Sequence, residues 1–295
     1  MLLAMDYKEV KEGLKQEKLV ALIGVEGGHM IEADMQKLEA LYKRGMRYMT
    51  LTWNNSTSWA SSAMDETAPS KSPPSGETYG DSLKRKGLTD FGKQIVKRMN
   101  ELGIIVDLSH TGEQTFYDAI AVTTKPVLLS HSSVWNICPV FRNVKDDQIK
   151  AVAKNGGVIC INFYSGFISK DFDQRSEWLN GPGRKMIQDS LFYVSKDSVL
   201  MTAKWQQYYT DELRKVRPTI AQLVDHIDYI TKLVGGDHVG IGADYDGVGS
   251  VPVGLDDVTA YPKITEELLK RGYSKKSIKK ILGENVLRVM KANFR

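Results

Sequence analysis

GIIVDLSH (103–110) and KPVLLSH (125–131) are two short apolar runs that both end in Ser-His, and they decide the fold. Four more short apolar runs occur along the chain, each ending in a polar or aromatic residue: LVALIGVE (19–26), MRYMTLTW (46–53), GGVICINFY (156–164) and HVGIGAD (238–244). All six are rich in Val, Ile and Leu and barely alternate with polar residues. This pattern is typical of strands that are buried on both faces, as in a parallel sheet.

Amphipathic helices are predicted between these strands. Apolar residues recur at helical spacing over 35–42, 91–102 and 220–234. The second and third of these segments follow Thr89 and Thr219, which can cap a helix, and glycines end all three. Regular alternation of strand and helix indicates βαβ units around a parallel sheet, and so an α/β fold.

Two long segments interrupt this rhythm, at 54–87 and 165–217. Both follow the carboxyl end of a strand, where long loops usually cover a site. A helix is predicted within the second segment, over 196–214. Because the strand pattern resumes after each segment, neither is expected to be a linker, and residues 1–295 are expected to form one domain.

Composition excludes several classes of protein. Of the 295 residues, 42% are hydrophobic and 26% charged, which is typical of a globular protein and not of a disordered one. No apolar run is long enough for a transmembrane helix. The start of the chain lacks the basic region of a signal peptide, and Cys138 and Cys160 are too few for a disulfide framework, so we expect a cytoplasmic location. The basic residues near the end form the polar side of a helix without a nucleic-acid motif, which argues against nucleic-acid binding.

The residues that end the six strands suggest chemistry. They are Glu26, Trp53, His110, His131, Tyr164 and Asp244. In a (β/α) barrel, active sites are built at the carboxyl ends of the strands. Two histidines and two carboxylates at one edge are suitable ligands for a divalent metal such as zinc.

Each of these residues also has a structural explanation. A histidine at a strand end can simply be hydrogen-bonded, Glu26 can cap the next helix, and Asp244 can belong to a turn. A Ser/His hydrolase is a weaker alternative, because no G-x-S-x-G motif presents a serine. Of the other histidines, His226 is expected to be structural and His238 opens a strand at the wrong end of the sheet.

Four longer motifs resemble the membrane (renal-type) dipeptidase family. They are the segment 24–55 that begins GVEGGH, GLTDFGKQIVKRMNELGIIVDLSH (87–110), KPVLLSHSSVWNICPVFRN (125–143) and HVGIGADYDGV (238–248). The resemblance covers about residues 18–290. It implies a metal-dependent hydrolase of the (β/α)8 TIM-barrel type, related to the amidohydrolases, that holds two zinc ions and cleaves small dipeptides through a metal-bound hydroxide.

The resemblance also implies a role for individual residues. Glu26 matches the carboxylate that bridges the two metals, and His110 and His131 match two ligands of one metal. Arg142 matches the arginine that binds the terminal carboxylate of the substrate, for which a guanidinium is well suited. Asp244 matches the acid/base that handles the proton of the attacking water.

Two departures from the family keep other interpretations open. The family begins with a strand that ends in a His-x-Asp pair, which supplies ligands to the second metal, and no histidine precedes Glu26 here. We therefore expect the first two of the eight barrel strands to be absent from this sequence. In addition, Trp53 stands at the substrate side where well-studied members have a histidine. The alternatives are a non-catalytic or barely active barrel, stabilised by another chain or a homodimer, and a hydrolase of another amide or a lactone.

Overall fold

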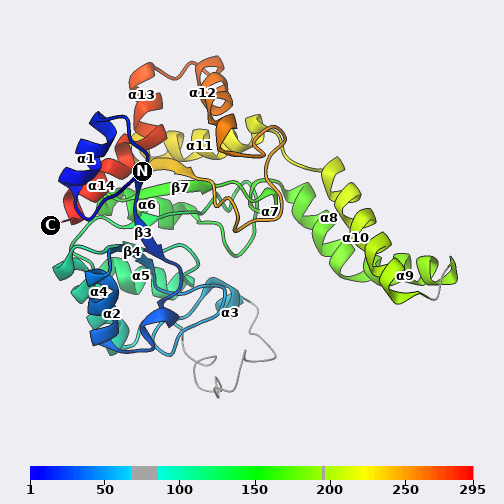
Figure 1. The fold of residues 1–295 in the computed structure, drawn as a ribbon, viewed down its shortest axis with the longest axis horizontal. Helices are drawn as coiled ribbons and strands as arrows, with labels where there is room; N and C mark the ends of the chain where they lie inside the picture. The colour runs from blue at the N-terminus through cyan, green and yellow to red at the C-terminus, as the bar shows by residue number, and fades with distance from the viewer. Residues whose placement is uncertain (68–85, 195–196, 295) are drawn as a thin grey trace.

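A six-stranded parallel sheet forms the centre of the molecule (Figure 1). The computed structural model describes residues 1–67, 86–194 and 197–294. Neighbouring strands pair in chain order, each parallel to the next. The strands are β3 (Ile23–Val25), β4 (Met46–Thr50), β5 (Ile105–Asp107), β6 (Leu128–Leu129), β7 (Val158–Asn162) and β8 (Val239–Gly242). All six predicted strands are confirmed, and so is the α/β class. In the described ranges the pairing runs from β3 to β8 and does not return to β3.

Helices follow the strands as the sequence predicts. Thr89 and Thr219 both cap their helices through their side-chain oxygens, and Gly103 ends α4 with a φ of 86°. Four helices pack against strands of the sheet: α2 against β4, α4 against β5, α6 against β7, and α11 against β8. The bounds of the helices up to α6 are α1 (Tyr7–Lys15), α2 (Met35–Lys43), α3 (Ala63–Thr67), α4 (Asp90–Leu102), α5 (Glu113–Val122) and α6 (Asp146–Asn155). Those of the later helices are α7 (Ser165–Ile168), α8 (Lys170–Asn180), α9 (Pro182–Val194), α10 (Ser198–Lys215), α11 (Ile220–Val234), α12 (Tyr261–Lys270), α13 (Lys275–Lys279) and α14 (Asn285–Asn293).

The start of the chain contains a unit that the sequence analysis did not predict. Strands β1 (Leu2–Leu3) and β2 (Val20–Ala21) pair in parallel, with α1 between them, and form a separate two-stranded sheet. The apolar run at 19–26 is therefore divided between β2 and β3. The side chain of Asp6 accepts a hydrogen bond from the backbone N–H of Glu9 and so caps α1.

The two faces of the strands have different neighbours because side chains alternate along a strand. On β5 and β7, Val106, Ile159 and Ile161 belong to the main core, which the surrounding helices share. Ile105 and Val158 belong to a second cluster on the opposite face, and Val289 of α14 packs into it. Helix α14 therefore packs against this second face, which we call the inner face of the sheet.

Hydrogen bonds place α14 at the amino-terminal end of the strands. Asn285 donates to the carbonyl oxygens of Gly236 and Val239, and Asn293 donates to the carbonyl oxygen of Pro126. These carbonyl groups lie just before or at the start of β6 and β8. The carboxyl ends of the strands are therefore left for the candidate site.

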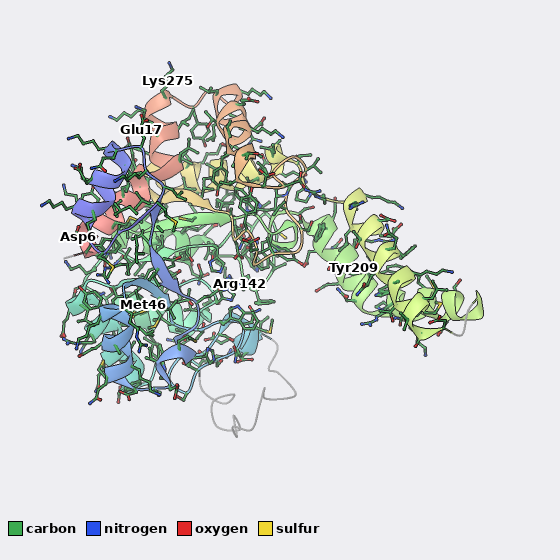
Figure 2. The ribbon with its side chains drawn as sticks, in the orientation of Figure 1. Asp6, Glu17, Met46, Arg142, Tyr209 and Lys275 are labelled. Carbon is green, nitrogen blue, oxygen red and sulfur yellow. The ribbon has the colours of Figure 1, made fainter. Side chains whose placement is uncertain are left out.

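The interruption at 165–217 is more helical than the sequence predicted. Helix α10 confirms the prediction over 196–214, but α7, α8 and α9 also occur in this segment. Ser169 and Asp197 accept backbone hydrogen bonds at the starts of α8 and α10. We call α8, α9 and α10 the helical arm, because they project away from the sheet in Figure 1. Phe172 and Trp205 are buried in a small core of the arm's own, and Figure 2 shows Tyr209 on the same arm.

The other interruption, at 54–87, and the expected lack of a transmembrane helix remain to be compared with the structure. In the interruption at 54–87, residues 56–67 contain turns and α3, and 68–85 lie outside the described residues. Among the described helices, none combines the length and the apolar character needed to cross a membrane.

Candidate metal centre

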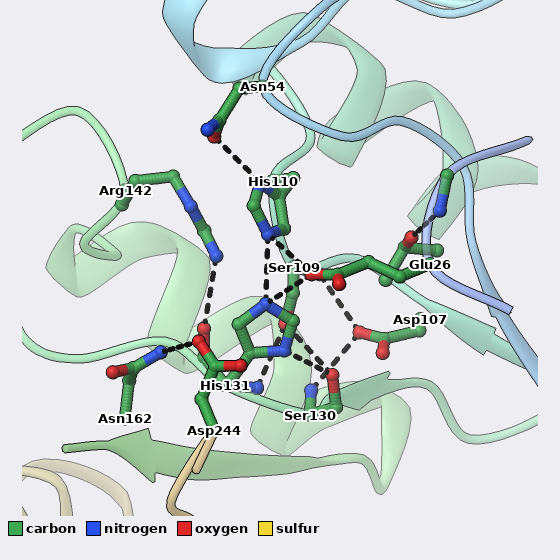
Figure 3. Close-up of polar contacts among 12 residues, drawn as sticks. Glu26, Asn54, Asp107, Ser109, His110, Ser130, His131, Arg142, Asn162 and Asp244 are labelled. Carbon is green, nitrogen blue, oxygen red and sulfur yellow. Dashed lines mark hydrogen bonds and ion pairs between the residues drawn. The ribbon is translucent and has the colours of Figure 1, made fainter. Parts of the chain in front are cut away.

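Three of the predicted ligands converge on one point (Figure 3). Glu26 follows β3 directly, His110 lies in the turn after β5, and His131 lies in the turn after β6. Glu26 Oε1 is 2.9 Å from His110 Nε2 and 3.1 Å from His131 Nε2. The two Nε2 atoms are 2.9 Å from each other. The carboxyl ends of neighbouring parallel strands share an edge, which explains why residues so distant in sequence meet here.

The donor set fits a divalent cation such as zinc. Two imidazole nitrogens and a carboxylate oxygen are common zinc ligands, which bind at about 2.0–2.2 Å. When both Nε2 atoms carry lone pairs, as metal ligands must, two lone pairs and a carboxylate oxygen face one another at these distances, and a cation between them relieves their repulsion. The triangle of Oε1 and two Nε2 atoms is therefore an arrangement that a cation satisfies.

Further hydrogen bonds orient both imidazole rings. His110 Nδ1 is 3.0 Å from the side-chain oxygen of Asn54, and His131 Nδ1 is 2.7 Å from Ser130 Oγ. An amide oxygen can only accept, so His110 carries its proton on Nδ1 and keeps the Nε2 lone pair for a metal. Contacts of this kind commonly fix the tautomer of metal-binding histidines.

The charge states also suit metal binding. Burial lowers the pKa of His110 to about 3, so its ring is neutral near pH 7. The contacts with the imidazoles of His110 and His131 lower the pKa of Glu26 far below its usual value, although burial of the carboxyl has the opposite effect. A neutral imidazole and an ionised carboxylate are the forms that bind metals.

Asp244 lies beside this triangle (Figure 3). One oxygen of its carboxylate accepts a hydrogen bond from the side-chain amide of Asn162 at 3.1 Å. Asp244 has a φ of 58°, in the left-handed region that few non-glycine residues adopt. A Cβ at Gly247 would lie 2.3 Å from Asp244 Oδ1, so only glycine leaves room for this carboxylate.

Arg142 is almost completely buried next to the histidines. Its Nη2 donates to the backbone carbonyl of His131 at 3.3 Å, and its guanidinium lies over the Phe167 ring. Its Nε has no partner among the described residues. Burial lowers the pKa of Arg142 to about 10, while the carboxylates of Asp244, Asp107 and Glu26 act in the opposite direction. The side chain is therefore a cation near pH 7, with donor capacity to spare.

A cavity of about 400 Å³ adjoins the site. His110 and Arg142 line it, together with Phe116 and Trp135. Trp53, also a predicted site residue, lies close to His110: its side chain is half exposed and its ring centre is 6.3 Å from that of His110.

Two of the remaining histidines, His226 and His238, lie elsewhere. His226 is fully buried in α11, where its Nδ1 accepts a hydrogen bond from the N–H of Val134 and its Nε2 contacts the carbonyl of Ile168. The sequence has one His-x-Asp, His226-Ile227-Asp228, but Asp228 pairs with Arg271 and not with a metal ligand. His238 lies just before β8, at the end opposite the site, as predicted.

The structure adds residues that the sequence analysis missed. Asn54 and Ser130 hold the imidazoles, Asn162 holds Asp244, and the fully buried Asp107 lies beneath both histidine turns. Asn162 ends a strand just before the residue that was considered, Tyr164. Asp107 was visible as a charged residue in an otherwise apolar run, which is itself a signal, because buried carboxylates need partners.

A parallel α/β fold that carries metal-ligating side chains at the carboxyl ends of its strands is the arrangement expected of a metal-dependent hydrolase. The chain belongs to the membrane dipeptidase family (peptidase family M19), whose family model matches residues 1–294. It is therefore an enzyme of the metallodipeptidase class, and the family resemblance seen in the sequence is confirmed.

Solved structures share this fold. One is a metallopeptidase from Rhodobacter sphaeroides with a bound phosphinate mimic of the dipeptide L-Ala-D-Ala; it has 22% identity and a TM-score of 0.74, and the match covers 99% of this chain and 68% of that one. The probable dipeptidase PvdM from Pseudomonas aeruginosa has 24% identity and a TM-score of 0.76, with coverage of 98% and 73%. An amidohydrolase from the same organism has 22% identity and a TM-score of 0.73, with coverage of 99% and 78%. At these identities the likeness concerns the fold.

Proposed function

We propose that this chain is a zinc-dependent dipeptidase that acts on small dipeptides. The convergence of Glu26 Oε1, His110 Nε2 and His131 Nε2 carries the proposal. Family membership supports the class of reaction, and the donor set supports zinc. Zinc, when bound, polarises the scissile carbonyl and lowers the pKa of a water molecule.

The chain's own residues would perform the remaining tasks. Arg142 is a buried cation whose Nε–H has no partner in the described part of the chain, and we assign to it the free carboxylate of the dipeptide. Asp244 is fixed by Asn162 next to the histidines, and we assign to it the transfer of a proton from the attacking water to the leaving amine. Trp53 is assigned to substrate contact at the rim, where its indole N–H can donate a hydrogen bond but cannot shuttle a proton.

Metal analysis tests the centre directly. We expect purified protein to bind zinc with high affinity, and we expect the His110→Ala/His131→Ala double variant to lose it, because only one of three ligands remains. His238→Ala is the matched control, since His238 lies at the opposite end of the strands and contacts the carbonyl of Gly157. Equal zinc content in all three proteins would refute the assignment.

A weakly active enzyme is the second candidate. Within the described ranges, Glu26, His110 and His131 form the only cluster of three metal-ligating side chains. Two-metal sites clamp the reacting oxygen atoms from both sides, and one metal alone provides only part of that effect. Dipeptide hydrolysis with added zinc separates the candidates: efficient turnover supports the dipeptidase, and zinc binding with only slow turnover supports the weakly active enzyme.

A further inference from the structure

Asp107 is a fully buried carboxylate at the carboxyl end of β5, and the proposed function does not use it. It lies on the inner face of the sheet, because it follows Ile105 by two residues and so shares its side. Its neighbours on that strand are apolar. A charged group without exposure to water is costly unless its hydrogen bonds compensate, so its contacts indicate its purpose.

One oxygen of Asp107 holds both histidine turns. Asp107 Oδ1 accepts a hydrogen bond from the backbone N–H of Ser109 at 3.0 Å and another from the backbone N–H of Ser130 at 3.1 Å. Ser109 and Ser130 are the residues directly before His110 and His131. A single atom therefore fixes the backbone of both turns relative to each other, across two neighbouring strands.

The two serines extend this link to the second imidazole. Ser109 Oγ accepts a hydrogen bond from the backbone N–H of His131 at 3.0 Å, and Ser130 Oγ contacts His131 Nδ1 at 2.7 Å. Ser109 Oγ also lies 3.5 Å from Ser130 Oγ. Asp107, Ser109 and Ser130 thus connect the turn that carries His110 to both the backbone and the ring of His131 (Figure 3).

The second carboxylate oxygen of Asp107 contributes no hydrogen bond to the two histidine turns. Oδ2 is buried and has no hydrogen-bond partner in the part of the chain that the structure describes. Among the described residues, Oδ1 is the only oxygen of this carboxylate that accepts hydrogen bonds. An amide oxygen in the same position could therefore accept the same two bonds, from the N–H groups of Ser109 and Ser130.

We propose that Asp107 is a positioning residue that sets the separation of the two histidine ligands, and so raises the affinity of the site for a divalent metal. The inference rests on the proposed metal centre and concerns how that centre is built. Residues that orient metal ligands typically change metal affinity by 10–100-fold when they are removed.

The test compares zinc affinity, measured by competition with a chelator, in the wild type, Asp107→Asn and Asp107→Ala. We expect Asp107→Ala to weaken zinc binding roughly 10–100-fold. We expect Asp107→Asn to keep the wild-type affinity, because its oxygen can accept from both N–H groups. The absorption spectrum of the cobalt-substituted protein, which reports ligand geometry, should change in Asp107→Ala and stay unchanged in Asp107→Asn.

Asn100→Ala is the matched control. Asn100 is also buried, its side-chain oxygen accepts from the backbone N–H of Thr124, and its side-chain nitrogen has no partner among the described residues. It lies at the end of the sheet away from the site, so its loss should lower stability and leave zinc affinity and the cobalt spectrum unchanged.

The outcomes separate this inference from the proposed function. If the wild type binds zinc no better than the His110→Ala/His131→Ala variant, the metal centre itself is wrong. If the wild type binds zinc and Asp107→Ala binds it equally well, only the role of Asp107 is overturned. If Asp107→Asn loses as much affinity as Asp107→Ala, the charge of Asp107 matters and not its position, and the inference is likewise overturned. Should Asp107→Ala fail to fold, Asp107→Leu takes its place, because its apolar side chain fills the space of the carboxyl group and cannot accept either hydrogen bond; the same outcomes then decide.

Discussion

His110 has a φ of 68°, in the left-handed region that a residue with a Cβ seldom adopts. Its carbonyl oxygen accepts hydrogen bonds from the hydroxyl of Thr52 and the N–H of Ala63, which hold the strained backbone in place. Asp244 has a similar φ of 58°. Such strain persists only where the surroundings over-determine it, and it clusters at functional sites. Among the described residues, Glu17, Glu32, Ala33 and Asp246 also have a positive φ, so this conformation alone does not mark a site; at His110 and Asp244 it coincides with a candidate site residue.

Arg142 gives a prediction for substrate binding. Arg142→Ala should weaken hydrolysis of a free dipeptide by about 1.5–3 kcal/mol in kcat/KM, the range for a hydrogen bond to a charged group. A C-terminally amidated analogue, if it is cut, should be nearly unaffected, and Arg142→Lys should rescue only part of the loss.

The same side chain donates to the carbonyl of His131, so zinc content must be measured alongside the kinetics. Equal loss of both activities with normal zinc content would mean that Arg142 supports the fold and does not bind the carboxylate.

His226 predicts a dependence of stability on pH. Burial lowers its pKa from 6.5 to about 4. The unfolded chain therefore binds a proton at His226 below pH 6.5, whereas the folded protein does so only near pH 4. Because the unfolded state binds more protons in this window, stability falls as the pH is lowered from about 6.5 to about 4, by about 3 kcal/mol from this group.

Urea unfolding at pH 7 and pH 4.5 checks the contribution of His226. His226→Gln should reduce the difference in unfolding free energy between the two pH values. His238→Gln serves as the control, because His238 is only partly buried. A pH difference that is the same in His226→Gln as in the wild type would contradict the prediction.

At the scale of elements, the six strands of the main sheet could be predicted from the sequence, because burial on both faces removes polar residues from a strand. The helices at 35–42, 91–102 and 220–234 could be predicted from their apolar periodicity and from the residues that cap or end them, whereas several shorter helices could not. Thr219 and Gln222 form a reciprocal capping box at the start of α11, as the local sequence indicates. The unit β1–α1–β2 was missed because two-residue strands have too little pattern to recognise. Partners such as Asn54 and Asn162 were missed because they reach the site only through tertiary contacts.

Helix α14 allows stability to be tested separately from the site. Asn285→Ala should lower the free energy of unfolding by about 2–3 kcal/mol, because it leaves the buried carbonyl of Val239 without its partner. Zinc affinity should not change, since α14 lies at the amino-terminal end of the strands. Asn136→Ala removes two hydrogen bonds from an exposed side chain and should cost much less. A large loss of zinc affinity in Asn285→Ala would show that the two ends are coupled.

At the scale of the whole molecule, the helical arm has a core distinct from that around the sheet. We propose that the chain is one domain in which the arm opens locally. Trp205→Ala should then speed amide hydrogen exchange in α8 and α10 and leave β5 and β7 protected. Ile159→Ala, in the main core, should speed exchange throughout. Faster exchange of β7 in Trp205→Ala would show instead that arm and sheet unfold together.

The position of α14 also bears on how the protein is made. Ile105, Leu128 and Val158 lie far earlier in the sequence than Val289, the residue of α14 that packs against them. During translation these side chains emerge from the ribosome long before their cover has been synthesised. A nascent chain that stalls before residue 285 would present an apolar surface of the kind that chaperones bind and that aggregates at high concentration. This apolar face of the sheet is therefore covered only after α14 has been synthesised and has packed against it.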